Sequence, residues 1–112
     1  MSQLTTHILD TTRGKPAAGV SITLYRQQAQ SWTTLATGTT NSDGRISDLL
    51  PKDEVLPSGT YKLKFLTQEY FDQQGVVTFY PFVEIVFAIT TSEHYHVPLL
   101  LNPFGYSTYR GS

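Results

Sequence analysis

In the stretch VSITLYR, residues 20–26, aliphatic residues alternate with residues that carry a polar group. Val20, Ile22 and Leu24 fall on one face, and two small polar residues and a tyrosine fall on the other. Successive side chains of a β-strand point to opposite faces of the sheet, so this period of two predicts a strand with one buried face.

Similar segments recur along the chain, and most are rich in β-branched and aromatic residues, which favour strands. Turn sequences that contain Asp-Gly, Pro/Gly or Asn-Pro separate several of them, as in NSDGR, PSGT and NPFG. Short strands with regular turns predict an all-β fold, an antiparallel β-sandwich. The further predicted strands are LTTHILD (4–10), SWTTLATGT (31–39), TYKLKFL (60–66), FVEIVFAIT (82–90), HYHVPLLL (94–101) and GYSTYR (105–110).

One segment, TQEYFDQQG, indicates a short helix rather than a strand. Thr67 is placed as its N-cap, Glu69 lies in its first turn, and Gly75 would end it. Pro98 interrupts the predicted strand 94–101, which indicates either an edge strand or a position whose amide is not needed by the ladder.

The composition predicts one globular domain, residues 1–112. Hydrophobic residues make up 39% and charged residues 15%, which argues against disorder. The net charge of −1 argues against a nucleic-acid partner, and the absence of cysteine excludes disulfides and thiolate metal sites. No apolar run approaches the roughly 20 residues of a membrane span, and the start has no signal-peptide pattern. We therefore expect no membrane partner and a cytoplasmic location, or a periplasmic one if the chain is a processed mature form.

The three histidines are the first candidates for chemistry. His94 and His96 are two residues apart and would share one face of a strand, a spacing that can supply two metal ligands, with His7 as a third. The alternative is structural, with one of the pair hydrogen-bonded in the sandwich and the other solvated. His7 is either a partly buried structural residue or a general acid or base, because its pKa lies near neutrality.

Two further positions leave alternatives open. Arg45 follows an Asp-Gly turn and is either a solvated charge at a hairpin or a group that binds an anion or carbonyl. Tyr109 and Arg110 lie at the end of the chain, where they are either frayed surface residues or part of an interface or site.

Several motifs together resemble the 5-hydroxyisourate hydrolases, the transthyretin-like enzymes of purine breakdown. The closing residues FGYSTYRGS are the most specific part of this resemblance, because a Tyr-Arg-Gly-Ser end separates the enzymes from the vertebrate hormone carrier. The other parts are LTTHILDTTRGKPAAGV at the start, DGR at 43–45 and EHYHVPLLL at 93–101. The resemblance covers nearly the whole chain in the same order.

This resemblance implies a transthyretin-like sandwich of two four-stranded sheets with one short helix. It implies a homotetramer with its sites in a channel at the dimer–dimer interface. The implied reaction is hydrolysis of 5-hydroxyisourate, the product of urate oxidation, to 2-oxo-4-hydroxy-4-carboxy-5-ureidoimidazoline, with no metal and no other cofactor. The residues that match the family's site are His7, Arg45, His96 and Ser112 as catalytic groups, and His7, Arg45, Tyr109 and Arg110 as substrate-binding groups.

Two alternatives remain at this point. The first is a transthyretin-like carrier that binds a small molecule without catalysis. The second is an appended sandwich domain, because GKPAAGVSITLY followed by TTNSDGRI is similar to the first half of carboxypeptidase-regulatory-like domains. That second similarity ends before HYHVPLLLNPFGYSTYRGS.

Overall fold

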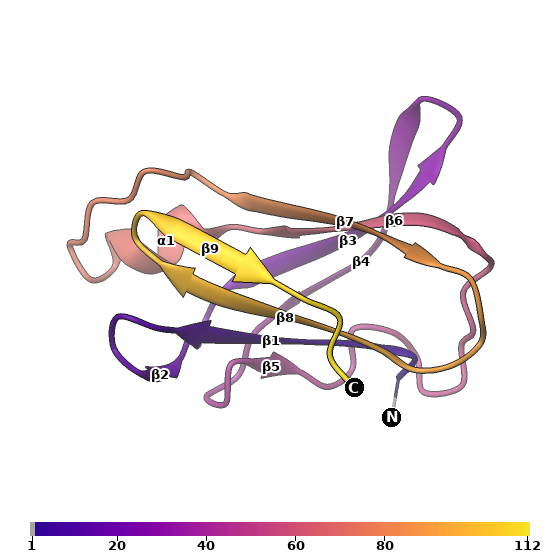
Figure 1. The fold of residues 1–112 in the computed structure, drawn as a ribbon, viewed down its shortest axis with the longest axis horizontal. Coiled ribbons are helices and arrows are strands. Elements are labelled where there is room, and N and C mark those ends of the chain that lie inside the picture. Colours follow the sequence, from indigo (N-terminus) through magenta and orange to yellow (C-terminus); the bar gives the residue numbers. More distant parts are fainter. Residues whose placement is uncertain (1) are drawn as a thin grey trace.

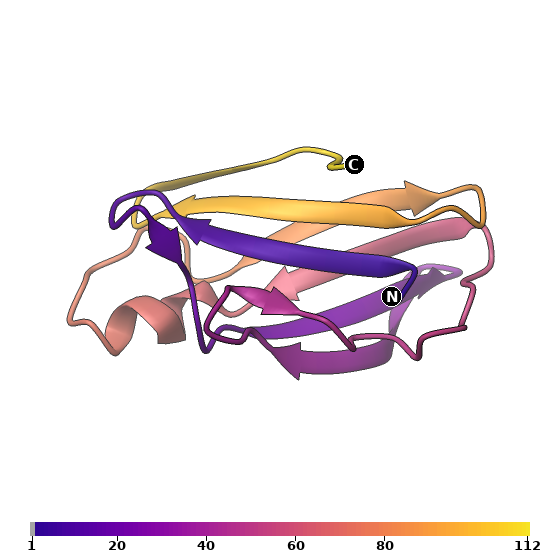
Figure 2. The same cartoon turned by 90° about the horizontal axis from the view of Figure 1, so that it is seen from below.

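The computed structural model describes residues 2–112 and shows a sandwich of two β-sheets (Figure 1, Figure 2). Seen from the side, the two sheets form separate layers, and the helix lies at one end (Figure 2). In chain order the elements are β1 (Leu4–Asp10), β2 (Lys15–Pro16), β3 (Ser21–Gln28), β4 (Ser31–Thr39), β5 (Arg45–Ile46), β6 (Gly59–Phe65), α1 (Thr67–Asp72), β7 (Val83–Ile89), β8 (Tyr95–Asn102) and β9 (Gly105–Thr108).

The strand order confirms the predicted sandwich. The first sheet has the order β2-β1-β8-β9, and β5 also pairs with β1. The second sheet has the order β4-β3-β6-β7 and is antiparallel throughout. The first sheet therefore has five strands instead of the expected four. The additional strand arises because β2 and β5, of two residues each, pair with different parts of β1.

Within the first sheet, β1 and β8 run parallel, from Leu4 opposite Tyr95 to Asp10 opposite Leu101. The sheet is thus not antiparallel at this pair, in contrast to the prediction. A two-residue hairpin joins only antiparallel strands, whereas parallel strands need a long connection. The chain between β1 and β8 includes the whole second sheet, so this requirement is met.

The core lies between the sheets and contains the apolar faces that the alternation predicts. Val20, Ile22 and Leu24 are no more than 1% exposed, and three residues of β6 are fully buried. Asp10 is also buried, but its carboxylate accepts hydrogen bonds from the Tyr70 hydroxyl at 2.8 Å and from two backbone amides. Burial of this charge is therefore compensated by hydrogen bonds. The buried side chains of β6 are Tyr61, Leu63 and Phe65.

The helix α1 lies where the sequence indicates it, but its predicted N-cap is wrong. Leu66 occupies the cap position, and no side chain caps the helix. Thr67 is the first helical residue and is buried, and its hydroxyl has no hydrogen-bond partner among the described residues. The amide of Leu66 still donates to the carbonyl of Ser21, so the strand pairing continues directly into the helix, and an apolar residue that cannot cap takes the N-cap position. Within residues 2–112, no helix is long and apolar enough to cross a membrane.

The C-terminal strand β9 ends at Thr108, two residues earlier than predicted. Its ladder with β8 stops at the pair Leu99 and Thr108, and the Thr108 hydroxyl donates to the carbonyl of Pro98 at 2.7 Å. Pro98 therefore lies in β8, which has β1 on one side and β9 on the other. It stands at the point where the ladder between β8 and β9 stops. The second of the two sequence alternatives, an amide that the ladder does not need, is the one observed.

The turn before β5 depends on a glycine. Gly44 has a φ of +71°, and its carbonyl accepts a hydrogen bond from the amide of Ile8 at 2.9 Å. A Cβ at this position would lie 2.5 Å from the carbonyl oxygen of Ile8. The turn therefore packs directly on β1, which fixes the position of Arg45 beside that strand.

We expect Gly44→Ala to destabilise the protein more than Gly14→Ala. Gly14 has a similar φ of +65°, and a Cβ added there would have no neighbour within 4 Å, so alanine incurs only the left-handed strain of about 1–2 kcal/mol. At Gly44 the clash should add about 1–3 kcal/mol. Urea unfolding of both variants measures the difference. Equal losses in the two variants would contradict the close packing of this turn.

Candidate active site

Pairing of three strands places the candidate site on the outer face of the first sheet. Along β1, Thr5 and His7 are half-buried, whereas the residues that alternate with them are buried. Thr5 lies opposite His96 of β8, and His7 lies opposite Arg45 of β5. Side chains of directly paired residues share a face of the sheet. The structure therefore brings together four side chains that are spread over most of the sequence.

Thr5 is the hydrogen-bonding centre of this group. Its Oγ1 lies 2.8 Å from His96 Nδ1 and 3.0 Å from His94 Nε2. The two imidazole rings are nearly parallel, with an interplanar angle of 17° and centroids 6.5 Å apart. Since Nδ1 of His96 is held by Thr5, its Nε2 is the ring nitrogen left for a ligand.

The end of the chain packs against His96. The amide of Gly111 donates to the carbonyl of His96 at 2.8 Å, and the two residues form an isolated β-bridge. A Cβ at Gly111 would lie 2.6 Å from Cδ2 of the His96 ring. Only glycine fits at position 111, because the backbone there lies directly against the His96 ring. This close approach places Ser112 next to His96.

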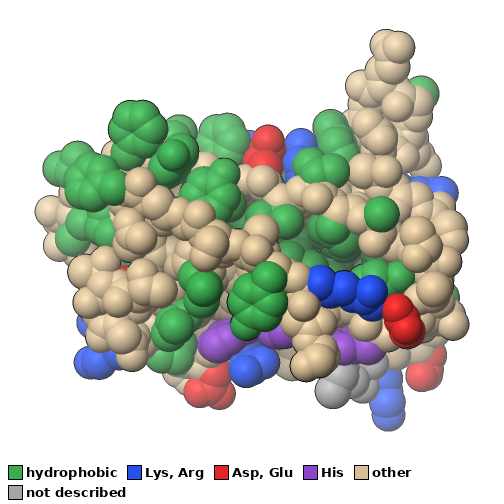
Figure 3. Space-filling view, in the orientation of Figure 1, with side chains coloured by type: hydrophobic (Ala, Val, Ile, Leu, Met, Phe, Trp, Pro, Cys, Tyr) green, Lys and Arg blue, Asp and Glu red, His purple; other side chains and the backbone are tan. Residues whose placement is uncertain are grey.

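Residues of β1, β5, β8 and the tail line an open depression of about 540 Å³. In Figure 3 the histidine side chains lie in a row along the lower part of the face shown, with a positively charged side chain beside them. His7 is not part of the lining, but it lies next to it as the strand partner of Arg45. The lining residues are Thr5, Thr6, Arg45, Ile46, Ser47, His94, His96 and Ser112.

The electrostatic environment keeps two histidines uncharged near neutral pH. The pKa of His7 is lowered from the ordinary 6.5, first by burial and then by the positive charge of Arg45. The pKa of His96 is also lowered from 6.5, by burial, by Arg45 and by the two other histidines. A neutral imidazole can accept a proton, so both are suited to act as bases.

Tyr109 and Arg110 do not reach this depression. They line another one, of about 350 Å³, between β7 and the tail. Arg110 forms an ion pair with Glu93 at 2.7 Å, and its guanidinium carbon lies 4.3 Å from the centre of the Tyr95 ring. The hydrogen bond from Arg110, followed by its positive charge, lowers the pKa of the exposed Glu93 carboxylate. Within one chain, Arg110 therefore anchors the tail, and Tyr109 is 59% exposed.

In the H-x-H pair, both imidazoles are hydrogen-bonded to the Thr5 hydroxyl. His94 is exposed, and His96 is half-buried and hydrogen-bonded. Among residues 2–112, no group of three or more His, Asp or Glu side chains is arranged to hold a metal ion.

Two residues at the site were not assigned a role from the sequence. The alternation of β1 places Thr5 on the face of His7, but only the strand register shows that it meets His94 and His96. Gly111 belongs to the tail motif, and nothing in the sequence indicates that it contacts an imidazole ring.

Comparison with known proteins identifies relatives over nearly the whole chain. The family model described as "HIUase/Transthyretin family" matches residues 4–111. A 5-hydroxyisourate hydrolase from Mus musculus is 51% identical, over 99% of this chain and 96% of its own. A 5-hydroxyisourate hydrolase from Salmonella dublin is 49% identical, over 97% of this chain and 80% of its own.

Solved structures share the fold. The 5-hydroxyisourate hydrolase of Klebsiella pneumoniae superposes with a TM-score of 0.86 at 41% identity, covering 100% of this chain and 94% of its own. Sea bream transthyretin in complex with thyroxine superposes with a TM-score of 0.91 at 35% identity, covering 97% of this chain and 94% of its own.

We expect both His7 and His96 to titrate below pH 6.5, and Arg45→Gln to raise both midpoints, because it removes a positive charge that opposes protonation. Side-chain NMR titration of labelled histidine measures this. Arg26→Gln is the matched control, since Arg26 lies on β3 in the other sheet. Midpoints that do not move in Arg45→Gln would show that the guanidinium does not act on the histidines.

Proposed function

The chain belongs to the HIUase/transthyretin family, and from that premise we propose that it is a hydrolase that opens the ring of 5-hydroxyisourate. Its relatives that carry this name support the activity. The observation that carries the proposal is the placement of Arg45 and His96 in the lining of one open depression, with His7 beside Arg45 and the pKa of both His7 and His96 lowered.

The reaction needs a base and then an acid. Water adds to a ring carbonyl, so a C–O bond forms, and the C–N bond to the ring nitrogen then breaks. The water loses one proton and the leaving nitrogen gains one. We assign the base to His96, since its Nε2 is free for a ligand and the residue lines the depression, while His7 lies beside it. A positioned general base contributes about 10²–10⁴-fold to the rate.

Arg45 suits the charge that develops during this addition. As water adds, the carbonyl oxygen gains negative charge, and a fixed positive group close by stabilises it. The guanidinium offers a planar fork of donors that matches carbonyl oxygens. Ser112 lines the same depression, where its hydroxyl is available to hold the substrate. Substrate contacts of Tyr109 and Arg110 require an approach from another subunit, because within one chain both face a different depression.

We propose a homotetramer as the assembly that provides this second subunit. Large apolar side chains are exposed near α1 and the β8–β9 turn, and Figure 3 shows them grouped at one end of the molecule. Tyr80 packs edge-on against both Phe79 and Tyr106, so the group is contiguous. Exposed patches of this kind mark contact surfaces in soluble proteins.

A non-catalytic carrier is the second candidate. The observation in its favour is the close superposition with sea bream transthyretin, whose structure holds thyroxine. A carrier binds its ligand without consuming it, so substrate decay separates the two candidates.

The first test is the ultraviolet decay of freshly made 5-hydroxyisourate with and without the protein. We expect accelerated decay, and a loss of at least about 100-fold in kcat/KM for His96→Ala and Arg45→Ala. Arg26→Ala, on the opposite sheet, should retain the activity of the unaltered protein. Light scattering on the same samples gives the mass of the assembly. A folded tetramer that leaves the spontaneous rate unchanged would exclude the hydrolase and favour the carrier.

The second test concerns the tail. Gly111→Ala should reduce kcat strongly, because its methyl group would displace the His96 ring. Gly105→Ala is the control within the same segment, since its Cβ would meet only the Asn102 side chain at 3.6 Å. Kinetics and thermal unfolding of both variants separate a site effect from general instability. Equal kcat values would contradict the role of this contact.

A further inference from the structure

We propose that His94 and Thr5 form a proton relay that connects His96 to solvent. This inference rests on the proposed hydrolase activity, because it assigns a route to the protons that the reaction releases and consumes. Thr5 and His94 are positioning residues in this scheme, since they act on the substrate through His96.

The geometry of the chain is continuous. Thr5 Oγ1 lies 2.8 Å from His96 Nδ1 on one side and 3.0 Å from His94 Nε2 on the other, both within hydrogen-bond distance. A hydroxyl group has only one proton to donate. That one proton cannot serve both ring nitrogens, so at least one imidazole must donate to Thr5, and the two imidazoles cannot choose their tautomers independently.

In two arrangements Thr5 donates to one histidine and accepts from the other, and the relay uses these two. In the first, His96 carries its proton on Nδ1 and donates it to Thr5, Thr5 donates to His94, and Nε2 of His96 is a bare base. In the second, His94 donates to Thr5, Thr5 donates to Nδ1 of His96, and Nε2 of His96 carries a proton. The first is ready to act as a base and the second as an acid.

The relay converts one arrangement into the other during the reaction. Nε2 of His96 takes a proton from the attacking water, Nδ1 passes its proton to Thr5, and Thr5 passes its own to Nε2 of His94. His94 then releases the proton on its Nδ1 to solvent. When Nε2 of His96 protonates the leaving nitrogen, the same transfers run in reverse and His94 takes a proton back. The protons balance over one turnover.

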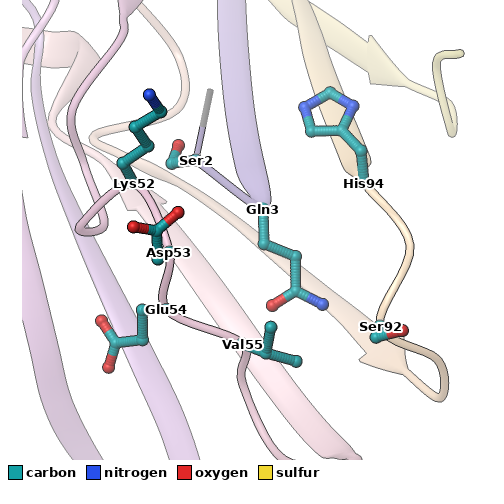
Figure 4. A pocket seen from close by; sticks show the side chains of 8 residues that line it. All are labelled: Ser2, Gln3, Lys52, Asp53, Glu54, Val55, Ser92 and His94. Atoms are coloured by element: carbon teal, nitrogen blue, oxygen red, sulfur yellow. The ribbon is translucent and has the colours of Figure 1, made fainter.

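The outer end of the relay is open to water. His94 is exposed and borders a second depression, of about 330 Å³, as well as the one at the candidate site. Figure 4 shows His94 on one side of this second depression and Lys52 and Asp53 on the other, with Gln3 between them. Its lining is mostly polar and charged, which suits exchange of protons with solvent.

The charges around His96 favour onward transfer. Burial lowers the pKa of His96 most, and Arg45 from β5, His7 from β1 and His94, just before β8, lower it further. An imidazolium at this position is therefore unfavourable. A route that carries the extra positive charge away from His96 during the reaction reduces the free-energy cost of protonating this residue.

The kinetic test compares Thr5→Val with Thr5→Ser. Valine keeps the shape and removes the hydroxyl, so kcat should fall about tenfold, a part of the 10²–10⁴-fold effect of a general base, with KM nearly unchanged. Serine should restore kcat. Thr33→Val is the control outside the site, because it removes a hydroxyl that bonds to Gln28 at 2.9 Å on the other sheet. A Thr5→Val enzyme with unaltered kcat would overturn the relay.

Small bases give a second kinetic readout that a structural role would not produce. His94→Ala should lose kcat and regain it when imidazole is added, because the base enters from the exposed side. Thr5→Val should not be rescued, since the gap lies between His96 and the added base. Rescue of both variants, or of neither, would overturn the proposed order of the relay.

An NMR measurement tests the chain without any turnover. At pH 8.5, His94→Ala should shift the ring ¹⁵N resonances of His96 in the unaltered background and leave them unchanged in Thr5→Val. If the His96 resonances respond in this way but the protein does not accelerate substrate decay, the hydrogen-bond chain is retained and the hydrolase is rejected. Activity without coupling would retain the hydrolase and reject the relay.

Discussion

The parallel pairing of β1 with β8 is the constraint on which the site depends. It joins the two ends of the sequence, and its register sets Thr5 opposite His96. The turn at Gly44, packed on the same strand, then sets Arg45 opposite His7. A shift of one residue in either register would move these side chains to the opposite face. The buried alternate residues of β1 prevent such a shift, so the hydrophobic core also fixes the site.

The tail, residues 109–112, is the second element of this arrangement. Within one chain, different residues of the tail attach it to the sheet and contact His96. Arg110 fastens it to Glu93 and Tyr95, while Gly111 brings the backbone against His96. The ion pair is exposed and contributes little to stability by itself. Its effect is to restrict where Ser112 lies. The motif of residues 109–112 thus combines an anchor, a close contact and a serine in the depression.

Much of the fold could be predicted from the sequence, because alternation of apolar residues is a local property. For that reason the alternation predicts the buried face of Val20, Ile22 and Leu24 correctly. The parallel pair and the interrupted ladder at Pro98 could not be predicted, since they depend on which distant strands meet. The cluster of His7, Arg45, His96 and Ser112 came from the family resemblance, which alone carries such long-range information. Thr5 illustrates the limit, because its position on the strand was evident and its two histidine partners were not.

The lowered pKa values of His7 and His96 connect stability with the proposed chemistry. Above pH 6.5 both residues are neutral in the folded and the unfolded chain, so the site imposes no electrostatic cost. As the pH falls below 6.5, the unfolded chain binds protons that the folded chain does not, and the free energy of unfolding decreases until the folded pKa values are passed. Arg45 contributes to this cost, yet a positive charge at its position is what a developing oxyanion requires. In the proposed reaction one guanidinium therefore serves both needs at neutral pH, since it adds to the lowering of both histidine pKa values and offers charge to the reacting carbonyl.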